Sequence, residues 1–338
     1  MSEQRSYSKW PGTNKFYFDG RIMMGPDGKR AIITFFLIFI PAIVFISQPA
    51  VYFIQEYNNP AAFLTHLFLT FLSLLFLARV SLKNPGFIPK QWPPFAIGPY
   101  GAKPVEEIIR EAFNPKEIPL ESNLTRLKYC STCNIIRPPR CSHCSDCGVC
   151  VEKFDHHCPW VGNCVAKRNY RDFIGFLTTT SLVCCCTLGW TAYHIADVSI
   201  KNNETGIKAF AEALPNTGAS IALLIYSFIA IWFVVGMCSF HTYLLCTGQT
   251  TYEKLKGAFD NPVGNPYYRS NCWENFVWFF KNPLAPEHFN LREKVEDTST
   301  IYHSHSKEAM MNSPKECNEP ISPSEIRSFK ISTPSDSL

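Results

Sequence analysis

The stretch 130–164 reads CSTCNIIRPPRCSHCSDCGVCVEKFDHHCPWVGNC and holds eight of the 15 cysteines and three of the nine histidines of the chain. Paired Cys-x2-Cys with interleaved histidine is the spacing of tetrahedral zinc sites. Few large apolar side chains accompany these residues, so bound metal must supply the folding free energy that an apolar core would otherwise provide. The stretch therefore predicts a zinc-binding domain.

Two closed zinc sites need eight ligands, whereas this stretch offers eleven cysteines and histidines. We assign to one site Cys130, Cys133, His143 and Cys150. We assign to the other Cys144, Cys147, His157 and Cys164. The assignment leaves three groups unused: Cys141, His156 and Cys158. The spacing also permits a different choice of eight ligands.

The tetrapeptide Asp155-His156-His157-Cys158 has the composition of a nucleophilic site. Cysteine is a good nucleophile as the thiolate, a neighbouring histidine can take the thiol proton, and a carboxylate can orient that histidine. If zinc fixes His157, it also holds the residues on either side. The alternative is that the tetrapeptide supplies metal ligands only. Cys141 has no base beside it and is interpreted as a packing residue.

Four apolar runs lie outside this stretch, at 31–54, 61–78, 173–196 and 219–246. Each approaches the roughly 20 residues that cross a bilayer, and the first is too long for a cleaved signal peptide. The chain is 46% hydrophobic and 18% charged, with a net charge of +4. This distribution excludes a soluble enzyme, and the small charge does not favour nucleic-acid binding. The sequence predicts an all-α membrane protein of four helices, with the zinc domain between the second and third.

Lys and Arg flank the spans on one side, as at Lys29, Arg30, Arg79 and Lys83, which predicts cytosolic termini and a cytosolic loop 83–171. The reducing cytosol favours zinc over disulfides in that loop. The predicted segments are 1–30, spans 31–82, the loop with its zinc core 126–171, spans 172–246, a cytosolic region 247–296 and a disordered tail 297–338. Asn203 begins a sequon in the link between the last two spans.

The tetrapeptide in this setting resembles the DHHC family of protein S-acyltransferases (palmitoyltransferases). Thr250-Thr251-Tyr252-Glu253 resembles the Thr-Thr-x-Glu motif of that family, and Asn265-Pro266-Tyr267 with Asn275 resembles its aromatic-and-Asn motif. The segment 11–21 is similar to the Golgi-resident, Ras-directed subgroup. The chain departs from the family pattern at Ala166, where Gly is usual, and at Cys141, where Ala or Ser is usual.

The resemblance implies a two-step transfer of palmitate from acyl-CoA to protein cysteines. Cys158 would be the nucleophile, His156 the general base and Asp155 the residue that orients His156, while Thr251 would hydrogen-bond Asp155. For the two threonines, helix capping after the fourth span is an equal alternative. The resemblance further implies two structural zinc ions, membrane-associated substrates of the Ras type, a small accessory subunit, and a Golgi or endoplasmic reticulum location.

Residues 126–171 carry eight Lys and Arg against three acidic residues, a net charge of +5. Such a patch beside a membrane can bind CoA phosphates or anionic headgroups, and Arg137 and Arg140 are the candidates for CoA. Trp160 is expected at the mouth of an acyl tunnel that Phe173 or Phe176 lines, although interfacial aromatics often serve as membrane anchors. The apolar spacing of 273–280 is compatible with a helix lying in the interface.

Two other functions are compatible with parts of the pattern. A non-catalytic adaptor could use the zinc domain to bind partner proteins, and it remains the alternative to the enzyme. A transporter or channel is disfavoured, because no span has an acidic or basic residue at its centre.

Overall fold

The computed structural model describes residues 4–90, 95–98, 101–104, 117–120, 123–126, 128–201, 206–259, 264–287 and 289–295. The sequon at Asn203 and the tail 297–338, for which disorder is predicted, lie outside these residues.

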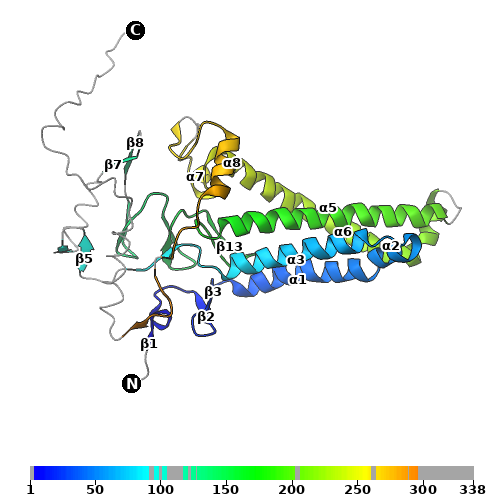
Figure 1. The fold of residues 1–338 in the computed structure, drawn as a ribbon, viewed down its shortest axis with the longest axis horizontal. Coiled ribbons are helices and arrows are strands. Elements are labelled where there is room, and N and C mark those ends of the chain that lie inside the picture. The colour runs from blue at the N-terminus through cyan, green and yellow to red at the C-terminus, as the bar shows by residue number, and fades with distance from the viewer. Residues whose placement is uncertain are drawn as a thin grey trace, which may run out of the picture. The chain divides into compact units, whose positions relative to one another are not determined.

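The helices of the apolar bundle are α1 Gly28–Ser47, α2 Pro49–Tyr57, α3 Ala61–Leu82, α5 Tyr170–Lys201 and α6 Gly206–Thr247. Four segments are long and apolar enough to cross a membrane: Gly28–Tyr57, Ala61–Leu82, Tyr170–Lys201 and Leu214–Thr247. Helix α5 packs against α3 and α6, and α1 packs against α3 (Figure 1). The predicted fold, four membrane helices with a cysteine-rich region between the second and third, is confirmed.

Large apolar side chains cover the outside of this bundle, including Phe36 on α1 and Phe71 on α3. Polar side chains pair inside it. Ser73 Oγ lies 2.7 Å from Thr180 Oγ1, and His66 Nε2 lies 2.9 Å from Thr187 Oγ1. This distribution, with apolar side chains outside and polar side chains inside, is the reverse of that in soluble proteins. It suits a bundle surrounded by lipid, where hydrogen bonds between helices replace hydrogen bonds to water.

Short hairpins make up the cysteine-rich region. Strand β9 (Lys128–Cys130) pairs with β10 (Ile135–Arg137), and β13 (His156–Cys158) pairs with β14 (Asn163–Val165). Strand β12 (Val149–Val151) lies between β11 (Ser142–Cys144) and β4 (Phe87–Ile88). All of these pairs are antiparallel. No strand of this region is longer than three residues, which is too short for independent stability, so its contacts with the bundle contribute to its fold.

Two buried asparagines attach this region to the C-terminal end of α3. Asn163 Nδ2 donates to the carbonyl oxygens of Ser81 at 3.1 Å and Lys83 at 3.0 Å. Asn169 Nδ2 donates to the carbonyl oxygens of Val80 at 3.2 Å and Cys164 at 2.8 Å. The last carbonyl groups of a helix have no partner within the helix, so these amides satisfy them and fix the position of β14.

The remaining described elements surround the same end of the bundle. Helices α7 (Thr251–Leu255) and α8 (Cys272–Lys281) follow α6, and Figure 1 shows them beside β13 at the beginning of α5. The N-terminal segment contributes β1 (Gln4–Arg5), a 3-10 turn Ser6–Lys9, β2 (Lys15–Tyr17) and β3 (Ile22–Met24). Strand β15 (Lys294–Val295) pairs with β1. Two further hairpins are β5 (Phe95–Gly98) with β6 (Gly101–Pro104) and β7 (Glu117–Leu120) with β8 (Asn123–Arg126).

Candidate active site and metal centres

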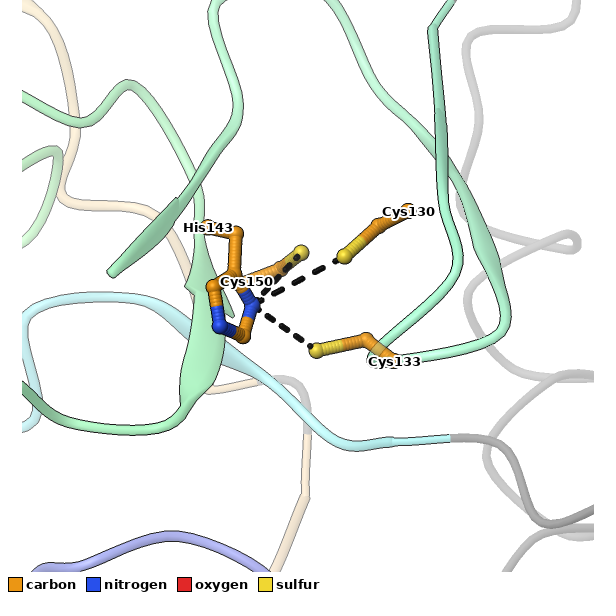
Figure 2. Close-up of side chains that lie close together, drawn as sticks. All are labelled: Cys130, Cys133, His143 and Cys150. Carbon is orange, nitrogen blue, oxygen red and sulfur yellow. Dashed lines mark hydrogen bonds between the residues drawn. The ribbon is translucent and has the colours of Figure 1, made fainter. Parts of the chain in front are cut away.

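The first candidate metal centre joins β9, the turn after it, β11 and β12. Figure 2 shows the sulfur atoms of Cys130, Cys133 and Cys150 gathered around one nitrogen of His143. The distances from His143 Nδ1 to these sulfurs are 3.7, 3.3 and 3.9 Å respectively. These are the four residues that the spacing assigns to one zinc site.

The second centre brings together Cys144, Cys147, His157 and Cys164. His157 Nδ1 lies 3.7 Å from the sulfur of Cys144 and 3.5 Å from each of the other two. Residues 143 and 144 are neighbours in β11 and serve different centres, because successive side chains of a strand point to opposite faces. The two ligand sets are therefore interleaved along the chain.

Both donor sets fit zinc. Zn–S bonds of about 2.3 Å and Zn–N bonds of about 2.0–2.1 Å in a tetrahedron separate sulfur from nitrogen by roughly 3.6 Å. The observed sulfur–nitrogen distances lie between 3.3 and 3.9 Å. The far nitrogen of His157, Nε2, is 3.0 Å from Asp27 Oδ2, a carboxylate–histidine arrangement that orients metal ligands. Sequence reasoning missed Asp27, because nothing local marks it.

Neither centre includes Cys158. In β13, His157 points to the second centre, so His156 and Cys158 share the opposite face of the strand. The two side chains stabilise each other's charged forms. His156 Nδ1 donates to Asp155 Oδ2 at 2.7 Å, which leaves Nε2 for the thiol. The structure thus brings the three residues of the predicted nucleophilic site together, with a hydrogen bond between Asp155 and His156.

This arrangement stabilises a charged pair. Burial would lower the pKa of His156, but its interactions with Asp155 and Cys158 outweigh burial and raise the pKa to about 9. Burial opposes ionisation of Cys158, yet the interaction with His156 lowers the pKa of the thiol. Burial likewise opposes ionisation of Asp155, and its contact with His156 holds the carboxyl pKa below the usual value. A thiolate beside a protonated imidazole is the reactive form of a cysteine nucleophile.

The two threonines after α6 have different roles. Thr251 donates twice to Asp155, from its hydroxyl to Oδ2 at 2.7 Å and from its backbone N–H to Oδ1 at 2.9 Å. Thr250 caps α7, and its hydroxyl accepts from the N–H of Glu253 at 3.2 Å. Sequence reasoning left support of Asp155 and helix capping open for both residues, and the structure assigns one role to each.

Comparison with known proteins agrees with this geometry. The family model for DHHC palmitoyltransferase matches residues 123–258. Protein S-acyltransferase 8 of Arabidopsis thaliana is 36% identical over 313 residues, which cover 87% of this chain and 73% of the relative. This chain belongs to the DHHC palmitoyltransferase family. Palmitoyltransferase ZDHHC9 of Pongo abelii is 37% identical over 297 residues, covering 83% and 78% of the two chains. Membership in this family disfavours the adaptor.

Glu253, the last residue of the Thr-Thr-x-Glu motif, makes a contact that the sequence did not reveal. Arg140 Nε and Nη2 lie 2.6 and 2.5 Å from the two carboxylate oxygens of Glu253. The same guanidinium donates to the Gly248 carbonyl at 3.0 Å and lies 4.0 Å from the ring centre of Tyr267. This bidentate pair compensates the charge of Arg140, so the binding of CoA phosphates by Arg140 stays a prediction that its observed contacts do not favour. Arg137 instead donates to the Tyr129 carbonyl at 3.3 Å.

The aromatic-and-Asn motif of this palmitoyltransferase ties its C-terminal region to the end of α6. Asn265 Nδ2 donates to the Thr247 carbonyl and Asn275 Nδ2 to the Cys246 carbonyl, both at 2.8 Å. Both asparagines are buried. They hold the segment that carries Tyr267 against the segment that carries Thr251.

An apolar cavity of about 260 Å³ lies among the membrane helices of this DHHC protein. Trp160, Phe176 and Thr187 line different parts of it. Trp160 is held there because its carbonyl accepts from Thr34 Oγ1 at 2.7 Å. Phe173 differs from expectation: it does not line the cavity, and its ring packs edge-on against His156 at 5.4 Å between centres.

His241 on α6 is a further neighbour of the DHHC tetrapeptide that sequence reasoning treated as a packing residue. It is fully buried, its Nδ1 lies 2.9 Å from the Tyr170 hydroxyl, and its Nε2 has no hydrogen-bond partner. Donor atoms of Asp155, His156 and His241 lie within 4.8 Å of one another. The sequence places His241 only near the end of a span, and helix packing brings it to the site.

Proposed function

We propose that this protein transfers palmitoyl or a similar long acyl chain from acyl-CoA to cysteine thiols of membrane-associated proteins, through an acyl-Cys158 intermediate. The observation that supports this most directly is the line of hydrogen bonds from Thr251 through Asp155 to His156, which shares one face of β13 with Cys158. When bound, zinc supplies folding free energy and holds β13 rigid, and the eight ligands named above would bind it.

In the first step, the Cys158 thiolate attacks the carbonyl carbon of the acyl-CoA thioester. The carbon–sulfur bond to CoA breaks, and the departing CoA thiolate takes the proton of the His156 imidazolium. Asp155 keeps the Nδ1 proton of His156 in place throughout, so Nε2 is always the nitrogen that exchanges a proton. The products are acyl-Cys158 and CoA thiol.

In the second step, the substrate cysteine gives its proton to His156 and attacks the acyl-Cys158 thioester. Cys158 leaves as a thiolate beside the imidazolium, which restores the starting state. The same base therefore serves both half-reactions.

The cavity supports a long-chain donor. Cys158 belongs to the same buried apolar cluster as Phe176 and Leu177, and both of these residues also line the cavity. Phe176 and Thr187 are eleven residues apart on α5, which corresponds to roughly 16 Å. With C–C bonds of about 1.5 Å, an extended palmitoyl chain spans roughly 19 Å. A palmitoyl chain attached to Cys158 and entering the cavity at Phe176 would fill the cavity.

Autoacylation of the purified protein with labelled palmitoyl-CoA tests the proposal. Wild type should acquire a label that hydroxylamine removes, and Cys158→Ser should not, while both retain two zinc ions per chain. Cys141→Ser is the matched control, because Cys141 is a free thiol of the same region outside both centres. Loss of zinc from Cys158→Ser, or label retained by that variant, would refute the assignment. A wild type that never acquires label would favour the adaptor.

The multi-pass topology and the family support further proposals. The flanking Lys and Arg support cytosolic termini and a cytosolic active site. The similarity of 11–21 to the Ras-directed subgroup supports a Golgi or endoplasmic reticulum location, Ras-like substrates and a small accessory subunit. Arg137 stays the proposed contact for the CoA phosphates. Protease protection in sealed vesicles tests the topology, since cleavage within 83–171 from the outside is expected of cytosol-side-out vesicles.

A further inference from the structure

A second cavity, of about 270 Å³, lies between the cysteine-rich region, the first turn of α5 and the C-terminal end of α8. Four of its lining residues are basic and one is acidic: Arg140, Lys153, Lys167, Arg171 and Glu152. Trp278 and Phe279 of α8 form its aromatic wall. The cavity is separate from the apolar one among the membrane helices, with which it shares no lining residue.

Two of these four positive side chains form ion pairs within the cavity lining or next to it. Arg140 pairs with Glu253, and Lys167 pairs with Glu152. Among the described residues, no ion pair involves Lys153 or Arg171. Both cations flank the ring of Phe279, with Lys153 Nζ at 6.0 Å and Arg171 Cζ at 5.5 Å from its centre. Burial and the neighbouring Arg140 lower the pKa of Lys153 to about 8.

The helix beside this cavity presents apolar side chains suited to a membrane surface. Trp273 and Phe280 of α8 and Leu284, which lines the cavity, are exposed, whereas Asn275 on the same helix is buried. Figure 1 shows α8 at the end of the bundle where α5 begins, lying across the direction of the membrane helices. Amphipathic helices in this orientation bury their apolar face at the level of the headgroups.

We propose that this cavity binds the phosphate of an anionic membrane lipid headgroup, with α8 lying in the headgroup layer. Lys153 and Arg171 supply the charge that a phosphate needs, and the ammonium group of Lys153 can donate charge-assisted hydrogen bonds. Arg171 belongs to the first turn of α5, so the cavity lies at the depth of the headgroups. The exposed apolar side chains of Trp273, Phe280 and Leu284 suit a membrane surface, which favours a lipid over the phosphates of CoA.

Binding of dioctanoyl phosphatidylinositol 4,5-bisphosphate to the purified full chain in detergent tests this inference without requiring activity. Lys153→Gln should weaken binding about tenfold, the expected loss for one charge-assisted hydrogen bond. Lys153→Arg should restore it. The matched control is Lys281→Gln, since Lys281 is exposed on α8 and does not line the cavity. Lys153 is the preferred position, because Arg171 also donates to the carbonyls of Phe279 and Asn282.

The outcomes separate the two sources of phosphate. Weakened lipid binding in Lys153→Gln alone, with an unchanged KM for palmitoyl-CoA, supports the lipid site. A raised KM for palmitoyl-CoA with unchanged lipid affinity would assign the cavity to the acyl donor and overturn the inference. Equal loss in Lys153→Gln and Lys281→Gln would also overturn it, since that result indicates general attraction to a basic surface. A protein that binds lipid but never autoacylates would leave this inference intact while refuting the proposed transfer.

Discussion

Replacing Thr251 with valine isolates one hydrogen bond of the active site. Valine keeps the size of threonine and removes the hydroxyl that donates to Asp155 Oδ2 at 2.7 Å. The backbone bond from residue 251 to Oδ1, at 2.9 Å, remains. A hydrogen bond to a charged group contributes about 1.5–3 kcal/mol. If that contribution is expressed in the transition state, Thr251→Val should slow autoacylation by about 10- to 150-fold.

Thr250→Val is the matched control, because Thr250 caps α7 and does not contact Asp155. Loss of an N-cap hydroxyl costs about 1 kcal/mol of stability, so this variant should unfold at a lower temperature and acylate at nearly the wild-type rate. The assay is single-turnover labelling by palmitoyl-CoA, with zinc content and thermal unfolding measured on the same samples. A wild-type rate in Thr251→Val, or an equal loss of rate in both variants, would refute the division of roles.

Three further predictions address the contacts that hold the site together. Asp27→Asn should weaken zinc at the second centre by about 10- to 100-fold, as expected for loss of the partner of a ligand histidine, measured by chelator competition. Asn163→Ala should lower the thermal midpoint, because it removes a buried amide whose bonds to α3 are each worth roughly 1 kcal/mol. Glu253→Gln should destabilise the protein by about 3–5 kcal/mol, since it leaves Arg140 buried without its partner. Replacing both members of that pair, with Arg140→Met and Glu253→Gln, should recover part of this loss in denaturant unfolding.

Each of these predictions has a result that contradicts it. Equal release of zinc from both centres in Asp27→Asn would deny the specific support of His157. An unchanged midpoint in Asn163→Ala would mean that other contacts attach the cysteine-rich region to α3. Additive losses in the double variant of Arg140 and Glu253 would show that the two residues act independently.

The exclusion of Cys158 from both ligand sets was predicted by counting, because two closed sites need only eight of the eleven cysteines and histidines. The structure adds the local reason: alternation along a short strand puts His157 on one face and His156 with Cys158 on the other. The same rule sends His143 and Cys144 to different centres. The four membrane spans could also be predicted, because bilayer thickness sets their length and composition regardless of how the helices pack.

Contacts between distant segments could not be predicted in this way. The basic patch is one cluster in the sequence, but in the structure Arg140 turns to a carboxylate 113 positions away. Arg168 pairs with Glu287 at 2.9 Å. The structure, and not the sequence, shows that Lys153 and Arg171 take part in none of the ion pairs among the described residues. Phe173 and Phe176 differ by one helical turn, and the packing of α5 decided which of them lines the cavity.

The amino-acid sequence by itself determined the membrane spans and the eleven cysteines and histidines from which the metal ligands come, because both depend on spacing along the chain. The tertiary structure decided which eight of these residues lie together, which carboxylate contacts His157 and which threonine side chain donates to Asp155. Those outcomes require contacts between segments up to 130 positions apart. Such contacts depend on the packing of whole helices and on the burial of charge, which no local pattern of residues encodes.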